Sequence, residues 1–285
     1  MNLKDNIYHP MVDFIYFFSI ILITSLCLNP LIIGISFLWS CIYIIKIKGI
    51  KKFFKLIGFL SIMMIFMVII NVLFNHKGLT VIMFLRNNNP ITLEVIINSF
   101  FMSLIFLAVI FWYMYFNELF FSEKIIYITS KLSPKLSLVM SMAFNFIPKY
   151  KEKYIEVRDY RKALGINYAG NFFYKIKEFS IIIFSVLSWS MENSIKISDS
   201  MRIKGYTGKN RSSFYIYRYN KRDYILLFLM IILIAVITLL IYKNPYLYWY
   251  YPRFYIKKSI VNIFIMLLFC FLCSLQFFKK ILRKV

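Results

Sequence analysis

The chain has 285 residues, of which 61% are hydrophobic, and it carries a formal net charge of +23. Its mean hydropathy is +0.70. Because a soluble domain needs a largely polar surface, this composition excludes a soluble globular protein and indicates an all-α polytopic membrane protein. The orientation rule for membrane loops explains the basic excess more simply than nucleic acid does, so we expect a lipid bilayer and no nucleic acid as partner.

Apolar segments of about 20 residues are long enough to cross a bilayer. Four such segments come first, at residues 11–27, 31–47, 57–74 and 95–116. The first two are short and meet at Asn29-Pro30, where a tight helical hairpin is expected. Two further candidates, residues 224–242 and 260–278, follow after a long interval. The sequence therefore predicts about six transmembrane helices in a cell (plasma) membrane.

Basic residues predict the orientation of these spans, because cytoplasmic loops are enriched in Lys and Arg. One short loop between the second and third spans is crowded with lysines, whereas the next loop has only two basic residues, Lys77 and Arg86. The crowded loop should be cytoplasmic, and six spans then place both termini in the cytoplasm. The basic residues between the last two spans argue the other way: Lys243, Arg253, Lys257 and Lys258.

The middle of the chain is too apolar for a soluble domain and too often interrupted by charge for simple spans. We expect three parts: a membrane domain at residues 1–117, a cytoplasmic block at 118–223 and two membrane helices at 224–285. In the block, the pattern predicts one amphipathic helix over 136–146 that is redirected at Pro148, a second over 149–164, and a long third over 172–204. The two later helices each end in basic residues closed by a glycine.

Small residues recur on one face of the long helix, where Ser190, Ser194 and Ser198 are spaced four apart. Such a ridge allows close approach of a second helix at a crossing. Exposure of the three serines to water is an equally good interpretation, and the sequence leaves both open.

Residue patterns for catalysis or cofactor binding are absent from the sequence. Its two histidines, His9 and His76, fall in segments expected on opposite sides of the membrane, and the four cysteines lie in apolar stretches. A possible phosphate loop near Gly208 fails, because Ile203 stands where the first glycine is needed and Asn210 where the magnesium-binding hydroxyl belongs. We therefore expect no enzyme activity, no cofactor, no metal and no ATP site.

An ordered series of segments resembles the transmembrane T component of energy-coupling factor transporters, which are ATP-driven vitamin and metal importers grouped with cobalt-transport permeases. The resemblance runs from about His9 to Leu240. The segments that carry it are residues 71–78 (NVLFNHKG), 136–148 (LSLVMSMAFNFIP), 157–165 (VRDYRKALG), 199–206 (DSMRIKGY) and 220–224 (NKRDY).

The resemblance implies two cytoplasmic coupling helices, each ending in an Ala-Arg-Gly signature that docks on one of two ATP-binding-cassette ATPase subunits. The signatures fall on Ala163-Leu164-Gly165 and Ile203-Lys204-Gly205. Both depart from the pattern, since Leu164 replaces the arginine and Lys204 keeps the charge without the planar guanidinium. The neighbouring positions included in these two expected sites are Arg161, Lys162, Arg202 and Tyr206, with Lys209 and Arg211 as nearby charges.

The function implied by the resemblance is a coupling subunit that performs no chemistry itself. It would transmit ATP-driven motion from two cytoplasmic ATPases to a separate, small substrate-binding membrane subunit for micronutrient uptake. The alternative is a self-contained secondary carrier or channel. That alternative predicts solute movement by the chain alone.

Overall fold

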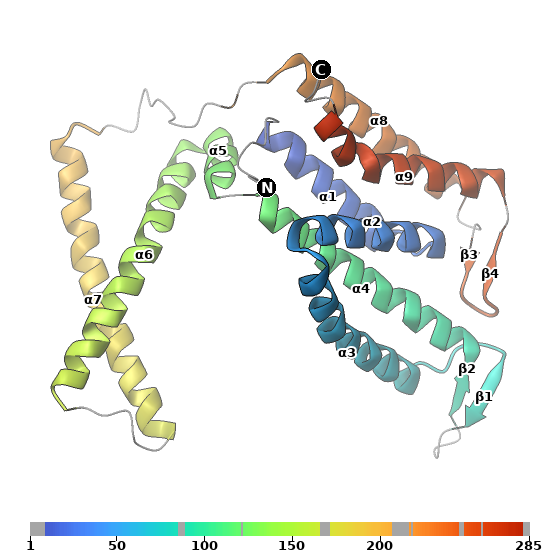
Figure 1. Ribbon diagram of the computed structural model, residues 1–285, viewed down its shortest axis with the longest axis horizontal. Coiled ribbons are helices and arrows are strands. Elements are labelled where there is room, and N and C mark those ends of the chain that lie inside the picture. The colour runs from blue at the N-terminus through green and yellow to red at the C-terminus, as the bar shows by residue number, and fades with distance from the viewer. Residues whose placement is uncertain are drawn as a thin grey trace. The chain divides into compact units, whose positions relative to one another are not determined.

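The structure is a computed structural model that describes residues 9–84, 89–120, 122–165, 172–206, 217, 219–244, 248–257 and 259–281. It divides into two compact units, the first made of Met1–Phe121 with Tyr217–Val285 and the second of Ser122–Ile216. Helices dominate both units (Figure 1). The expected Lys209 and Arg211 lie outside the described residues.

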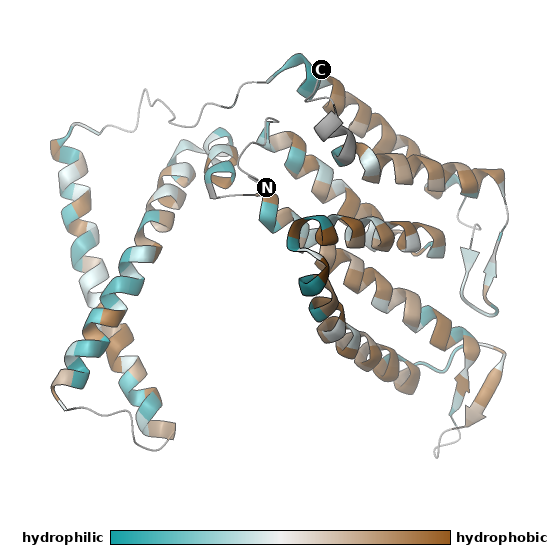
Figure 2. Cartoon of the chain, viewed as in Figure 1, coloured by the Kyte–Doolittle hydropathy of each residue, from teal (hydrophilic) through white to brown (hydrophobic). Residues whose placement is uncertain are grey.

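The first unit is a bundle of apolar helices, whose hydrophobic colouring is nearly continuous in Figure 2. Four of them are long and apolar enough to span a membrane, and α1 and α9 are shorter apolar helices. The protein is therefore an all-α, multi-pass membrane protein, as predicted. The helices are α1 (Pro10–Leu26), α2 (Pro30–Lys48), α3 (Ile50–Phe74), α4 (Leu93–Leu119), α8 (Lys221–Lys243) and α9 (Ile260–Ile281).

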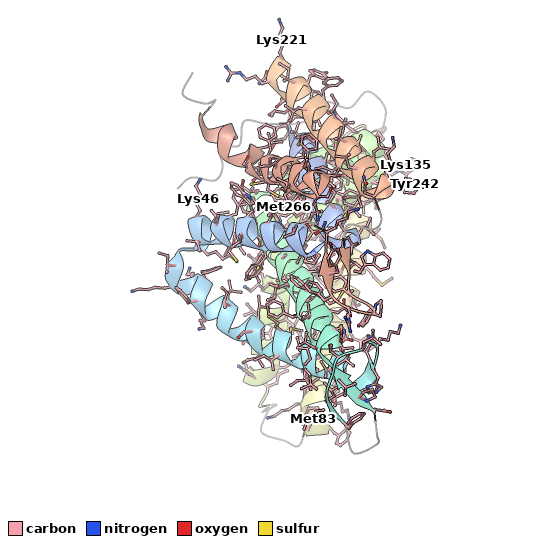
Figure 3. All side chains as sticks on the ribbon, turned by 90° about the vertical axis from the view of Figure 1, so that its right-hand side faces the viewer. Lys46, Met83, Lys135, Lys221, Tyr242 and Met266 are labelled. Carbon is pink, nitrogen blue, oxygen red and sulfur yellow. The ribbon has the colours of Figure 1, made fainter. Side chains whose placement is uncertain are left out.

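These six helices alternate in direction, as contacts at their ends show. At one end, His9 before α1 stacks on Tyr219 before α8 at 3.6 Å, and Lys48 of α2 pairs with Glu118 of α4 at 3.4 Å. At the other end, the Asn29 amide donates to Asn262 of α9 at 2.9 Å. We call the end with α1's start the basal end and the other the distal end. Figure 3 labels Lys46 near the basal end of α2 and Tyr242 at the distal end of α8.

Aromatic and polar side chains join α1, α2, α4 and α9 inside the bundle. Tyr16 and Tyr43 both donate their hydroxyls to the backbone carbonyl of Cys273, at 2.8 and 2.7 Å. Trp112, fully buried, donates to Ser36 at 3.0 Å. Since lipid offers no hydrogen-bonding partner, each of these polar atoms has to find one within the bundle. All four cysteines are free thiols.

Short β-hairpins, which the sequence analysis did not predict, close the distal end of the first unit (Figure 1). Strand β1 (Val81–Phe84) pairs antiparallel with β2 (Pro90–Thr92), and β3 (Tyr248–Trp249) pairs with β4 (Tyr255–Ile256). The Tyr251 hydroxyl accepts hydrogen bonds from the amides of Asn75 and Asn98, at 3.4 and 3.3 Å. The second hairpin is thus fixed to the distal ends of α3 and α4.

The predicted lysine-rich loop between the second and third spans is wrong. Helix α2 continues to Lys48 and α3 begins at Ile50, so Gly49 alone connects them. Gly49 has φ +79°, a left-handed conformation that few other residues adopt readily, and its N–H still closes α2 on Ile45. The lysines therefore lie on the adjoining turns of two helices, at the basal end: Lys46, Lys48, Lys51, Lys52 and Lys55.

The second unit contains α5 (Ser122–Leu132), α6 (Pro134–Ala163) and α7 (Phe172–Ile203). The long third helix was predicted to within one residue. The predicted break at Pro148 is wrong, because α6 runs through it as one helix. Proline removes one main-chain hydrogen bond and usually kinks or breaks a helix at a cost of about 3 kcal/mol. From Tyr150 onward, directly after Pro148, side chains of α6 contact α7: the Tyr150 hydroxyl accepts from Ser190, and Tyr154 meets Phe179 edge-on.

Helices α6 and α7 cross in an antiparallel sense, so that their C-terminal ends lie far apart (Figure 1). Tyr150 of α6 meets Trp189 of α7 edge-on at 6.1 Å, and Arg161 near the end of α6 reaches Glu178 near the start of α7. Their surfaces alternate between polar and apolar residues (Figure 2), unlike the helices of the first unit.

Candidate functional site

The end of α6 is a compact reversal closed by glycine. Helix α6 ends at Ala163, the Leu164 N–H donates to Tyr160 O at 3.1 Å, and the Gly165 N–H donates to Lys162 O at 3.0 Å. Gly165 has φ +79°, and a Cβ there would meet nothing within 4 Å. Glycine is therefore favoured by the backbone angle and not by lack of space. Leu164 is 78% exposed.

The end of α7 has the same backbone design. Gly205, at φ +73°, donates its N–H to Arg202 O at 3.0 Å, and the Tyr206 N–H donates to Met201 O at 3.0 Å. This pair of bonds is the Schellman arrangement, which satisfies carbonyls that the helix end would leave open. Lys204 is exposed, and Ile203 is 85% exposed.

Both expected signatures therefore project from a helix end into solvent within the second unit. The first presents Leu164 where the second presents Lys204, one residue before the glycine in each case. Arg202 is exposed beside Lys204, and Tyr206 follows the second glycine. One end is thus mainly aliphatic at its tip and the other is cationic.

Arg161, one of the two cations next to the first signature, has a partner inside the second unit. Its Nε and Nη2 atoms donate to Oε2 of Glu178 at 3.0 and 2.6 Å. The Glu178 side chain is only 6% exposed and that of Arg161 is 21% exposed. This ion pair joins the last turn of α6 to the first turns of α7. Lys162, the other neighbouring cation, is exposed.

The distance between the two ends follows from the length of α7. Glu178 lies beside Arg161, and Ile203 is 25 residues further along the same helix. At 1.5 Å per residue this corresponds to about 37 Å. The two ends therefore require two separate binding sites on whatever they contact.

The three serines of α7 have different surroundings. Ser190 donates to the Tyr150 hydroxyl at 2.8 Å and lies at the crossing with α6. Ser194 donates to the Ser190 carbonyl at 2.8 Å, and both Ser194 and Ser198 are exposed. The α6 crossing thus includes Ser190 and leaves the other two serines accessible.

An exposed apolar row accompanies these serines, and the sequence analysis missed it. Leu187 and Met191 are four residues apart and are 51% and 72% exposed. Ser194, seven residues after Leu187 and three after Met191, shares their helix face. The signal was the four-residue spacing of large apolar residues along α7: Ile183, Leu187, Met191 and Ile195. We call these four residues the α7 row.

One further ion pair lies within α7, between Glu192 and Lys196. Lys196 donates to Glu192 at 2.6 Å, and this hydrogen bond, with the charge of the ammonium, lowers the pKa of the Glu192 carboxyl. Among the described residues there is no group of three or more His, Cys, Asp or Glu side chains that could hold a metal ion.

Comparison with known proteins places this arrangement in a family. The family described as "CbiQ: Cobalt transport protein" matches residues 7–215, which include the first four helices of the first unit and both helix ends of the second. The chain belongs to the cobalt transport protein family. The match ends about ten residues after the second signature, so α8 and α9 lie outside it. This family membership confirms the resemblance inferred from the sequence.

A curated relative of this cobalt transport family protein is the "Energy-coupling factor transporter transmembrane protein EcfT" of Lacticaseibacillus paracasei. The two chains are 25% identical over 108 residues, a stretch that covers 37% of this chain and 41% of the relative. The matched part thus spans about two fifths of the relative's length. The family is one of membrane transporter components and not of enzymes.

Proposed function

We propose that the chain is the transmembrane coupling subunit of an energy-coupling factor transporter. It receives ATP-driven motion from two cytoplasmic ATP-binding-cassette ATPase subunits and passes it to a small substrate-binding membrane subunit that takes up a micronutrient. The observation that carries the proposal is the pair of exposed, glycine-capped helix ends, about 37 Å apart along α7. Family membership supports the same role.

The helix ends suit docking because they combine a rigid shaft with an abrupt reversal. Each end exposes its terminal side chains while the backbone bonds of the cap remain internal. An exposed cation such as Lys204 can enter an acidic groove on one ATPase and also guide its approach. Leu164 offers an apolar contact to the other ATPase, with Lys162 beside it.

The α7 row is the surface that we assign to the substrate-binding subunit. Its large aliphatic side chains are exposed to a degree that is unusual for a water-facing helix, whereas a partner embedded in lipid presents an apolar surface of its own. Ser194 and Ser198, beside the row, would let a partner helix approach closely.

The orientation follows from the charges of the first unit. The basal end carries the lysines that flank Gly49, and the chain leaves α4 and enters α8 at that same end. We propose that this end faces the cytoplasm. The second unit, with both helix ends, is then cytoplasmic as well.

Purification of the tagged chain from its native membranes tests the function. We expect it to co-purify with two ATPase chains or one ATPase homodimer and with a small membrane protein, and to bind no nucleotide when isolated. A secondary carrier or channel would instead move solute after reconstitution of the chain alone. Solute transport by the lone chain, or stoichiometric ATP binding by it, would refute the proposal.

A further inference from the structure

The β3–β4 hairpin at the distal end has no part in the coupling role. It connects α8, one of the four helices long enough to span the membrane, to the shorter apolar helix α9, so it lies where the hydrocarbon layer gives way to the lipid headgroups. The Tyr250 hydroxyl donates to Leu28 O at 2.8 Å, at the distal end of α1. With the bonds of Tyr251 to Asn75 and Asn98, this holds the hairpin against the ends of three helices.

A pocket of about 460 Å³ opens on this hairpin. Arg253 and Lys257 line it and are exposed, and no carboxylate within the described part of the chain forms an ion pair with either. Glu94, at the same end, is buried and its carboxylate accepts from the Thr80 N–H at 3.3 Å. The remaining lining is apolar or aromatic: Leu79, Trp249, Pro252 and Tyr255.

We propose that this pocket binds the phosphate of an anionic phospholipid headgroup in the membrane leaflet at the distal end. A guanidinium and an ammonium at one pocket match a phosphate that bears no compensating cation of its own. Trp249 and Tyr255 are 44% and 59% exposed, and such side chains concentrate at the level of the headgroups.

A lipid, and not a soluble anion, fits the remainder of the lining. Leu79 and Pro252 give the pocket an apolar side that can contact the glycerol and upper acyl chain of a lipid. A small soluble phosphate has no apolar atoms that could pack against this side. The proposal also explains Arg253 and Lys257, which argued against the expected orientation. Both side chains bind lipid phosphate in the leaflet at the distal end, so they do not mark the α8–α9 connection as a cytoplasmic loop.

The test measures lipid binding by the purified full-length chain in neutral detergent. Native mass spectrometry titrates short-chain phosphatidylglycerol against phosphatidylcholine, and a parallel thermal unfolding assay adds inorganic phosphate. We expect Arg253→Gln and Lys257→Gln each to weaken phosphatidylglycerol binding about fivefold, and the double variant about 25-fold. Lys243→Gln, which removes a cation at the same end outside the pocket lining, should change binding less than twofold.

Conservative variants separate charge from fold. Arg253→Lys with Lys257→Arg should retain binding within about threefold, and all variants should unfold at the wild-type temperature without lipid because the changed side chains are exposed. The proposal is overturned if the double glutamine variant binds phosphatidylglycerol like wild type. It is equally overturned if phosphatidylcholine binds as tightly, or if millimolar inorganic phosphate stabilises the chain as much as the lipid does. None of these outcomes depends on ATPase coupling.

Discussion

The ends of α6 and α7 can be compared residue by residue when they are aligned on Gly165 and Gly205. The backbones agree, with φ of +79° and +73° and the same N–H to carbonyl bond of 3.0 Å across the turn. The side chains differ, because Leu164 occupies the place of Lys204. The reversal of the chain at a helix end and the chemistry of the side chain presented there are therefore separate properties. Glycine provides the first, and the residue before it provides the second.

The largest expected effect concerns the ion pair that fixes the first end. Arg161→Ala leaves the carboxylate of Glu178 buried without its partner, and loss of one member of a buried pair typically costs 3–5 kcal/mol. Because Arg161 is partly exposed, we expect about 3 kcal/mol. Hydrogen exchange of the α6 and α7 amides would measure it. Arg202→Ala, at the exposed second end, is the matched control and should change exchange little.

A double variant then asks whether Arg161 also docks. Arg161→Met with Glu178→Leu replaces the pair by apolar side chains of similar size, which is often neutral for stability. We expect this variant to regain normal exchange and to retain both ATPases. If the double variant shows normal exchange but loses one ATPase, Arg161 is the docking cation at the end of α6.

The second effect distinguishes the cationic end from the aliphatic one. Lys204→Glu turns an attraction into a repulsion, and two charges about 4 Å apart interact by about 4 kcal/mol at an effective dielectric near 20. Even after desolvation is discounted, the affinity for one ATPase should fall more than tenfold. Pull-down of the ATPases from detergent extracts measures this, with Lys204→Arg expected to keep or improve docking.

Lys151→Glu is the charge-matched control, since Lys151 is exposed in the middle of α6, away from both ends. It should leave ATPase recovery at the wild-type level. If Lys204→Glu also retains its ATPases while reaching the membrane in normal amount, the end of α7 is only a helix cap and coupling lies elsewhere.

A third, moderate effect tests whether the α7 row serves a different partner from the two ends. Ser194→Leu adds bulk at the face that we assign to the substrate-binding subunit, where overpacking typically costs about 1–3 kcal/mol. We expect weaker recovery of that subunit with unchanged ATPase recovery. Ser185→Leu, on an exposed position of another α7 face, should affect neither. Normal uptake by Ser194→Leu would mean that this face meets water or lipid.

The smallest effect should be equal at the two ends. Gly165→Ala and Gly205→Ala each place a Cβ in free space but force a left-handed conformation that costs about 1 kcal/mol. Thermal unfolding of the two single variants should therefore shift alike. A shift at one end only would show that the two backbones are not equivalent in solution.

Most of the spans could be predicted from the sequence, because long apolar runs are bounded by charges or by prolines such as Pro10 and Pro30. The start of α3 could not be predicted. The charges of Lys51 and Lys52 indicated a loop, but a single glycine, Gly49, is enough to separate α2 from α3. Pro148 misled for a related reason. Local preference favoured a break there, whereas α6 continues through it to Ala163, with contacts to α7 from Tyr150 onward.

The candidate helix ends were located correctly as exposed, glycine-capped termini, but the partner of Arg161 was not. Glu178 lies 17 residues later in the chain and meets Arg161 only because α7 folds back antiparallel. The β-hairpins were missed because their strands are two to four residues long, too short for a two-residue period to be recognised.

The Cys273 carbonyl, shared by Tyr16 and Tyr43, has a consequence for biosynthesis. These tyrosines are separated from Cys273 by 257 and 230 residues, and the whole second unit is translated between them. During insertion, the hydroxyls of Tyr16 and Tyr43 enter the bundle before their shared acceptor, the Cys273 carbonyl, has been synthesised. The first helices therefore reach their native hydrogen bonding only when α9 leaves the ribosome and enters the membrane. A chain that stalls before α9 lacks the carbonyl that both phenols share, and its first helices remain without this link to the last helix.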